Sequence, residues 1–207
     1  IVSLLVALGV AIPLGILAAV NKETSWDFGA MGFALFGMSI PNFWMGPMLI
    51  LVGALWLGWF PVSGHEDQAS IVLPALTLGT AMAAILSRMI RSTLLEVLTE
   101  DFIRTARSKG LTEWVITLRH GLRNALFPVI TLLGLQLGTL LSGAVITETV
   151  FSWPGIGSLL VEAIHRRDYP VVQAAVLLIS FSYVMVNLFM DLVYAWIDPR
   201  VRIQGQI

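Results

Sequence analysis

Long apolar stretches dominate this sequence and most constrain what it can fold into. A helix needs roughly 20 apolar residues to cross a membrane, because each residue adds about 1.5 Å against a hydrocarbon layer of about 30 Å. Hydrophobic residues make up 57% of the chain and charged residues only 12%, against about 25% charged in soluble proteins. We therefore predict an all-α, polytopic transmembrane helix bundle with five spans, at approximately 1–20, 28–57, 71–90, 125–146 and 171–197.

Two spans carry a further local signal. The stretch 28–57 is too long for one straight helix and contains Pro41 and Pro47, which predicts a tilted or broken helix. In the fourth span Gly134, Gly138 and Ser142 form a smooth face. This face predicts close helix contact, either within the bundle or with a second subunit.

The basic residues predict the orientation, because Lys and Arg are retained on the cytoplasmic side. The chain begins at Ile1 in the middle of an apolar run, and we expect that at least one further helix precedes it. With alternating connections, we predict a cytoplasmic segment 91–124, an outside start and a cytoplasmic C-terminus. The outer side then receives only Arg166 and Arg167, and the cytoplasmic side receives Lys22, Arg88, Arg91, Arg104, Arg107, Lys109, Arg119, Arg123, Arg200 and Arg202.

Catalytic and metal-binding patterns are missing from the sequence. It has no GxxxxGK[ST], HExxH or GxSxG motif and no cysteine, and its three histidines are far apart. We predict no enzyme activity, no metal and no bound cofactor. The run His65-Glu66-Asp67 is more typical of a solvated turn than of a metal site. A net charge of -1 gives no indication of nucleic acid.

Four charged residues near span ends are interpreted as boundary residues. Glu148 and Asp191 lie where a carboxylate reaches interfacial water, and Arg88 and Arg91 are expected to extend toward the cytoplasmic surface as membrane anchors.

The cytoplasmic segment has the pattern of two helices joined at Gly110. Lys109 followed by Gly is typical of a helix end, and Thr112 is a candidate cap for a second helix to Leu122. Three interpretations remain open for this amphipathic elbow: docking onto a partner protein, a helix on the membrane surface, or a structural crossover. The first helix has apolar residues at three- and four-residue steps, namely Leu94, Leu95, Leu98, Phe102, Ile103 and Ala106.

Residues 101–111 (DFIRTARSKGL) and 119–128 (RHGLRNALFP) resemble the cytoplasmic loop of dipeptide, oligopeptide, glutathione and nickel ABC permeases. The motifs 73–79 (LPALTLG), 148–157 (ETVFSWPGIG), 167–170 (RDYP), 191–194 (DLVY) and 198–200 (DPR) support this resemblance, which extends from about Ile12 onward. The sequence departs from the wider EAA-loop pattern, of which only Ala106, Gly110 and Leu122 match. No role for Glu100 can therefore be taken from the EAA glutamate.

The resemblance implies a type I ABC importer permease with six helices, of which five are visible here. The expected unit is a single permease domain over 1–207 with a coupling segment at about 92–123. Its implied partners are a second homologous permease subunit, two cytoplasmic ATPase subunits that bind the ATP, an external solute-binding protein and the lipid bilayer. The implied ATPase-coupling residues are Glu100, Asp101, Arg104, Thr105, Ala106, Arg107, Gly110, Leu111, His120, Leu122 and Arg123.

The translocation pathway and the substrate are less constrained. Polar residues in or near spans can line a pathway or bond between helices. An intramembrane enzyme would need convergent ionisable residues inside the spans, and a passive channel has no use for the elbow. The substrate could be a dipeptide, an oligopeptide, glutathione or nickel. The pathway candidates are Ser39, Asn42, Gln136, Thr139 and Asn187.

Overall fold

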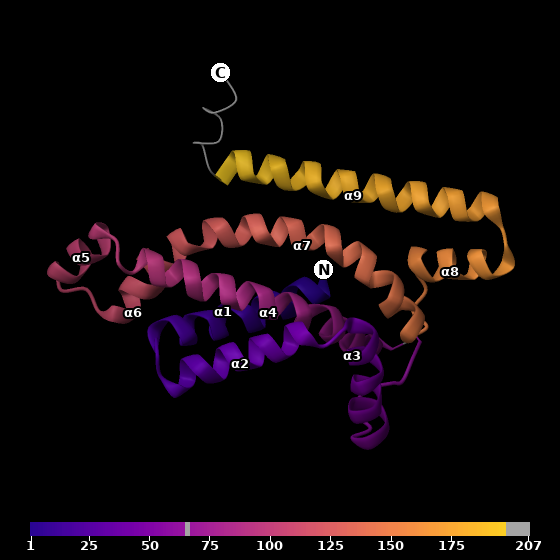
Figure 1. Ribbon diagram of the computed structural model, residues 1–207, viewed down its shortest axis with the longest axis horizontal. Coiled ribbons are helices and arrows are strands. Elements are labelled where there is room, and N and C mark those ends of the chain that lie inside the picture. The colour runs from indigo at the N-terminus through magenta and orange to yellow at the C-terminus, as the bar shows by residue number, and fades with distance from the viewer. Residues whose placement is uncertain (65–66, 198–207) are drawn as a thin grey trace.

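The computed structural model describes residues 1–64 and 67–197, except for the side chains of 139, 141, 142 and 194–197. Within those ranges it contains helices and no strand, as predicted (Figure 1). The long helices are α1 (Val2–Val20), α2 (Ser25–Ser39), α4 (Val72–Val97), α7 (Arg123–Val150) and α9 (Tyr169–Ile197). Shorter elements are α3 (Asn42–Leu49), α5 (Asp101–Ser108), α6 (Glu113–Val115), α8 (Ile156–Arg166), the 3-10 turn η2 (Gln68–Ile71) and two π-helical segments, η1 (Ile50–Trp56) and η3 (Ile116–Leu122).

Helices α1 and α4 form the centre of the bundle and run parallel to each other. A Cβ on Gly79 would lie 2.8 Å from the Ser3 carbonyl oxygen, and one on Gly15 would lie 2.6 Å from Ile90 Cγ2. The two glycines therefore let the helix backbones approach closely at both ends. The core beside them joins α1, α4 and α7 and consists of Ala7, Ala11, Met82, Ala83, Leu86, Ile90 and Val129.

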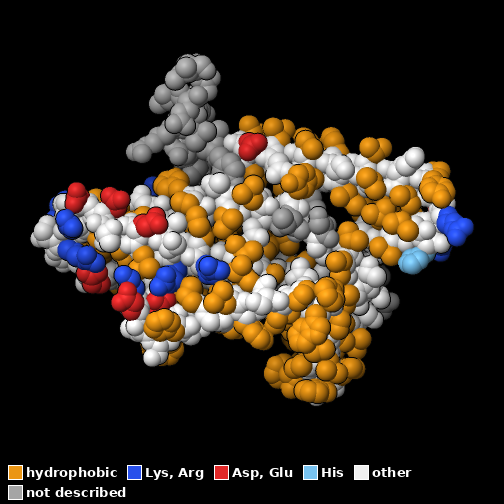
Figure 2. All heavy atoms as spheres, in the orientation of Figure 1, with side chains coloured by type: hydrophobic (Ala, Val, Ile, Leu, Met, Phe, Trp, Pro, Cys, Tyr) orange, Lys and Arg blue, Asp and Glu red, His pale blue; other side chains and the backbone are white. Residues whose placement is uncertain are grey.

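The long helices place their connections at two ends of the molecule. One end, here called the elbow end, holds the turn between α1 and α2 together with α5 and α6; the opposite end holds residues 57–64 and 67–71 and α8 (Figure 1). Acidic and basic side chains gather at the elbow end, whereas apolar side chains cover most of the remaining face (Figure 2). The described part of the chain thus separates the basic residues as the sequence predicts, with Arg166 and Arg167 at the opposite end. Arg200 and Arg202 lie outside the described residues.

The second predicted span is broken, as its prolines indicate. The axis turns by 103° between Ser25–Ser39 and Asn42–Trp56. The break falls at Ile40 and Pro41, because proline disfavours a helical conformation in the residue before it. Ile40 accordingly has an extended backbone. Pro47 is accommodated inside α3.

The connection before the last helix differs from the prediction. The spans predicted at 125–146 and 171–197 leave residues 147–170 as a loop on the outer side, yet α7 continues to Val150 and α8 fills residues Ile156–Arg166. Helix α8 packs against α7 and α9. With 11 residues, α8 is too short to cross a membrane.

Candidate functional site

The elbow is a small folded unit with its own buried contacts. Ile103 and Ala106 of α5 are buried with Ile116 of η3, and Leu98 packs against them. Gly110 has φ +76°, a left-handed conformation that glycine adopts without a Cβ clash, so the predicted break is confirmed. The first helix does not continue from α4, however, because α4 ends at Val97 and α5 begins anew at Asp101.

An ion pair closes the elbow across Gly110. The Arg107 guanidinium donates from Nε and Nη2 to the two carboxylate oxygens of Glu113, at 2.8 and 3.2 Å. These hydrogen bonds hold the pKa of Glu113 below its ordinary value. The prediction that the Thr112 side chain caps the second helix is wrong: Thr112 occupies the cap position, but its side chain makes no capping hydrogen bond.

The predicted coupling residues do not all face the same way. Ala106 is buried inside the elbow and Leu122 packs toward the core between α1, α4 and α7. His120 is half-buried. The remaining members are exposed at the elbow end: Glu100, Asp101, Arg104, Thr105, Arg107, Gly110, Leu111 and Arg123.

Two aromatic residues add an apolar element to this exposed surface. Trp114 is 67% exposed and Phe102 is 43% exposed. The apolar periodicity assigns Phe102 to the packed face of its helix, and Trp114 stands outside the apolar stripe of the second helix. An unpaired tryptophan on a short charged helix is typical of a contact residue, which is the signal that sequence reasoning missed.

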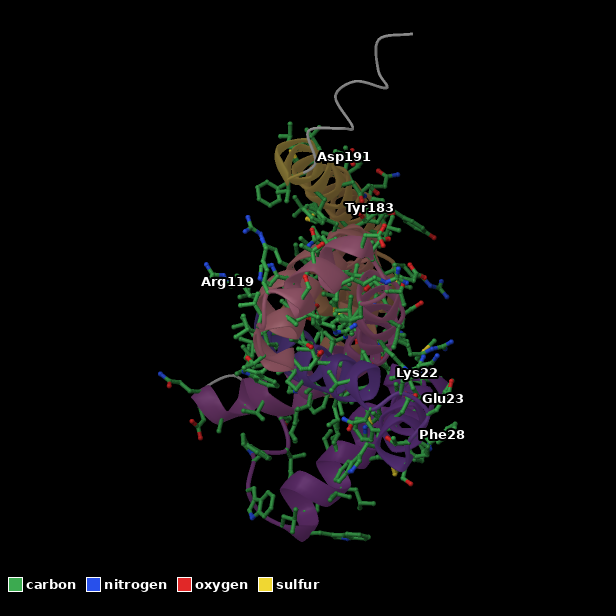
Figure 3. The ribbon with its side chains drawn as sticks, turned by 90° about the vertical axis from the view of Figure 1, so that its left-hand side faces the viewer. Lys22, Glu23, Phe28, Arg119, Tyr183 and Asp191 are labelled. Carbon is green, nitrogen blue, oxygen red and sulfur yellow. The ribbon has the colours of Figure 1, made fainter. Side chains whose placement is uncertain are left out.

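A pocket of roughly 500 Å³ opens beside the elbow. Figure 3 views the molecule from the elbow end and shows Arg119 projecting sideways, on the side of the bundle away from Lys22 and Glu23. The pocket brings together two of the predicted coupling residues, His120 and Arg123, with residues of α5, η3 and α7. Its lining consists of Phe102, Arg119, His120, Arg123, Asn124 and Phe127.

An ion pair with a buried carboxylate joins α2 to α4 close to the elbow. The Arg91 guanidinium donates from Nε and Nη2 to the two oxygens of Asp27, both at 2.6 Å. The side chain of Asp27 is 3% exposed and that of Arg91 is 26% exposed. The prediction that Arg91 extends to the membrane surface as an anchor is therefore wrong. The partners are 64 residues apart, so no local pattern could have paired them.

Two of the pathway candidates flank the break between α2 and α3. Ser39 is exposed and donates to the carbonyl oxygen of Leu35 at 2.9 Å. Asn42 begins α3. Its side-chain nitrogen Nδ2 lies 3.4 Å from the position that a Cβ on Gly143 of α7 would occupy. Irregular backbone at membrane depth is tolerated where it is buried in protein or lines a cavity.

The other pathway candidates do not join this pair. Gln136 is 9% exposed inside α7. Asn187 donates to the Tyr183 carbonyl oxygen at 3.0 Å within α9. The side chain of Thr139 lies outside the described residues. Gly138 approaches Tyr183 of α9 closely, since a Cβ there would lie 2.5 Å from Tyr183 Cε2, so this part of the predicted glycine face packs within the chain.

Glu148 has a structural position that the sequence did not indicate. Its carboxylate accepts a hydrogen bond from the Ser158 backbone N–H at 3.0 Å, at the first turn of α8. Negative charge is favourable at a helix N-terminus. Gly155 leaves room for this carboxylate, because a Cβ there would collide with it. A Cβ on Gly157 would lie 2.5 Å from the Val145 Cα and 2.9 Å from Glu148 Oε2, so Gly157 lets α8 approach the backbone of α7.

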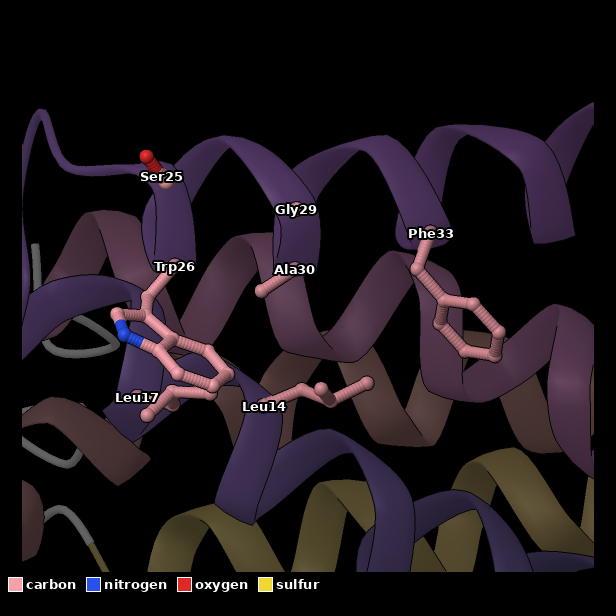
Figure 4. Close-up of a pocket in the computed structure, with 7 residues that line it drawn as sticks. All are labelled: Leu14, Leu17, Ser25, Trp26, Gly29, Ala30 and Phe33. Atoms are coloured by element: carbon pink, nitrogen blue, oxygen red, sulfur yellow. The ribbon is translucent and has the colours of Figure 1, made fainter.

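An apolar groove of roughly 460 Å³ runs between α1 and α2. Figure 4 shows its lining, in which Ser25 carries the only side-chain hydroxyl group. A groove of this composition suits acyl chains better than a polar solute. Its lining residues are Leu14, Leu17, Ser25, Trp26, Gly29, Ala30 and Phe33.

The turn before η2 shows no metal cluster within the described residues. Asp67 accepts from the Ala69 backbone N–H at 3.1 Å and caps the turn η2. His65 and Glu66 lie outside the described residues.

Comparison with solved structures identifies the fold. An inward-facing conformation of the MetNI methionine ABC transporter matches with a TM-score of 0.76, covering 95% of this chain and 90% of that chain at 19% identity. An amino acid ABC transporter matches with a TM-score of 0.61, covering 96% and 88% of the two chains at 16% identity. The predicted permease fold is thus confirmed.

Comparison with sequences gives closer relatives. The dipeptide transport system permease protein DppB of Escherichia coli K12 is 45% identical over 97% of this chain and 68% of its own length. The glutathione transport system permease protein GsiC of the same strain is 47% identical over 91% of this chain, which spans only 61% of that protein.

The family model of the binding-protein-dependent transport system inner membrane component matches residues 11–203. A transport component of this kind excludes the alternative of an intramembrane enzyme. The chain belongs to the family of binding-protein-dependent transport system inner membrane components.

Proposed function

We propose that this chain is the permease subunit of an ABC importer that carries short peptides across the cytoplasmic (inner) membrane. The observation that carries the proposal is the elbow. Within a family of inner membrane transport components, a small folded unit with exposed charged and aromatic residues stands at one end of an apolar bundle. A passive channel would give this unit no role.

The proposed substrate is a dipeptide or a similar small peptide such as glutathione. Support comes from the names of DppB and GsiC, to which the chain is 45% and 47% identical. Nickel, which the sequence resemblance also allows, has no support from these two relatives. For the pathway, we propose the region of the α2–α3 break, where Asn42 lies beside Gly143, with Ser39, Gln136, Thr139 and Asn187 as less supported members.

The proposed partners follow from the two ends of the molecule. Two ATPase subunits would dock at the elbow end, where Trp114 and Phe102 supply apolar contact area and Asp101 and Arg104 supply charge. An external binding protein would dock at the end that holds α8. A second homologous permease subunit would cover part of α9, whose large apolar side chains are mostly exposed and which packs within the chain on α7 and α8.

The proposed mechanism is alternating access. Closure of the ATPase subunits on ATP would move the elbow, and the elbow moves as a unit because Ile103, Ala106 and Ile116 pack together while Arg107 and Glu113 close it across Gly110. A rigid element transmits displacement to the spans better than a flexible loop. We further propose that residues 1–207 form one permease domain, with the elbow end in the cytoplasm.

Reconstitution tests this proposal. The full-length permease, placed in proteoliposomes with the ATPase, second permease and binding protein of its own operon, should accumulate radiolabelled dialanine only when ATP is supplied on the elbow side. The permease alone should hydrolyse no ATP above background. Uptake that continues without the ATPase subunits would indicate a channel and would contradict the proposal.

A further inference from the structure

The ion pair between Asp27 and Arg91 calls for a functional explanation, because the Asp27 side chain is only 3% exposed and a buried carboxylate is costly unless its pairing is specific. The Arg91 side chain keeps 26% of its surface exposed. The pair is geometrically specific. Both guanidinium contacts are 2.6 Å long, and the Glu23 backbone N–H donates to Asp27 Oδ2 at 2.9 Å. Glu23 itself has φ +62°, so the turn between α1 and α2 is held in a strained conformation around this carboxylate.

Apart from this pair and a contact between Arg88 Nη1 and Met38 Sδ at 3.7 Å, the residues that α2 buries are small. The buried residues of α2 are Asp27, Ala30 and Ala34, and farther along a Cβ on Gly37 would lie 3.4 Å from Ala84 Cβ. Small side chains bury little area and allow the two helices to slide past each other. A bidentate ion pair, in contrast, fixes both the distance between the helices and their relative register. The Asp27–Arg91 pair therefore supplies the directional contact between the two helices.

The position of this contact links two functional regions. Arg91 lies two turns before the end of α4 at Val97, after which the elbow begins at Glu100. Asp27 lies in the first turn of α2, whose other end breaks at Ile40 into α3 beside the proposed pathway. A displacement of α4 that is imposed at the elbow can thus reach the break through α2.

We propose that Asp27 and Arg91 are positioning residues that make α2 move together with α4 during transport, so that movement of the elbow is delivered to the broken span. This inference rests on the proposed function, since it assigns a role within the same transport cycle. Neither residue touches the solute.

The test uses the complete reconstituted transporter and two readouts. Asp27→Asn keeps the shape of the side chain but removes its charge. We expect it to assemble with the ATPase subunits and to hydrolyse ATP, while dialanine transported per ATP falls by about fivefold or more, the lower end of usual coupling between sites. The double variant Asp27→Arg/Arg91→Asp exchanges the two charges and should restore part of the dialanine transported per ATP. Glu23→Gln removes the exposed pair with Lys22 and takes away one carboxylate charge in the same turn, while the Asp27–Arg91 contact stays in place. It is the matched control and should leave the ratio unchanged.

The second readout needs no substrate. The sequence has no cysteine, so spin labels can be placed at Gly32→Cys on α2 and Ser92→Cys on α4, both exposed positions. The distance between the labels should stay constant on addition of a non-hydrolysable ATP analogue in the wild-type background and should change in Asp27→Asn.

Failure of the inference is distinguishable from failure of the proposed function. A wild-type transporter without ATP-dependent uptake would contradict the function itself. With wild-type uptake established, an unchanged transport ratio and a constant label distance in Asp27→Asn would overturn the role of the pair, as would an equal loss in Glu23→Gln. If the Asp27→Asn protein does not accumulate in the membrane, Arg91→Lys is used in its place, because it keeps the charge balance but loses the bidentate geometry. The transport ratio and the label distance are then measured in that variant.

Discussion

Single residues explain motifs whose meaning the sequence alone leaves open. Glu148 looks like a carboxylate at a span boundary, and only the fold brings it onto the backbone of Ser158, ten residues later. Gly155 has an extended backbone with φ -154°, so its conformation does not require glycine. The requirement is space for the Glu148 carboxylate.

This steric explanation makes a prediction at Gly155. Gly155→Ala should push the Glu148 carboxylate away from Ser158 and lower the stability by about 1 kcal/mol, the usual magnitude for a lost cap. Thermal unfolding of the purified permease in detergent measures the change. In the double variant Gly155→Ala/Glu148→Ala the collision is relieved. The loss of stability of the double variant should therefore be smaller than the sum of the losses of the two single variants. Additive losses would mean that the two residues act separately.

At the scale of elements, the sequence predicts what depends on local chemistry. Within the described residues, three helices are long and apolar enough to cross a membrane, and up to five spans result if each bent pair of helices is one span. The prediction from apolar length gives the upper number. The break in the second span follows from Pro41 and the elbow from Gly110. The sequence does not predict α8, whose 11 residues are too short to cross a membrane, nor the π-helical turns η1 and η3, which depend on packing. It also misses the Asp27–Arg91 contact, because pairing across 64 residues is decided by how the helices pack.

The elbow provides a prediction that separates coupling from folding. Gly110 has φ +76°, and no heavy atom lies within 4 Å of where a Cβ on it would stand, so Gly110→Val carries only the backbone cost of about 1 to 2 kcal/mol. The spans do not depend on this turn, and the variant should reach the membrane at near-normal levels. We expect it to lose most ATP-dependent uptake and most co-purification of the ATPase subunits.

Gly110→Asn is the matched control, because asparagine tolerates the left-handed conformation better than valine. Gly110→Asn should retain more ATP-dependent uptake and more co-purification of the ATPase subunits than Gly110→Val. If Gly110→Val keeps uptake and ATPase binding at wild-type levels, the elbow does not couple the two subunits, and the membrane-surface or crossover interpretation takes its place.

At the scale of the whole molecule, the charge distribution and the packing agree. The bundle places the α1–α2 turn, the elbow and the start of α7 at one end, where acidic and basic side chains gather (Figure 2). The opposite end is joined internally, since the Gly64 backbone N–H donates to the Phe151 carbonyl oxygen at 3.3 Å. The fold fixes which segments share an end, and the positive-inside rule predicts which end is cytoplasmic.

Cysteine labelling in intact cells tests that orientation, against a background free of natural cysteines in this sequence. Ser63 and Ser108 are exposed at opposite ends. Ser63→Cys should react with a membrane-impermeant maleimide from outside, whereas Ser108→Cys should react only after the membrane is opened. Ser87, which is fully buried, should stay unlabelled as Ser87→Cys in both conditions. Labelling of Ser108→Cys in intact cells would place the elbow outside, where no ATPase subunit could reach it, and the coupling role would fail with the orientation.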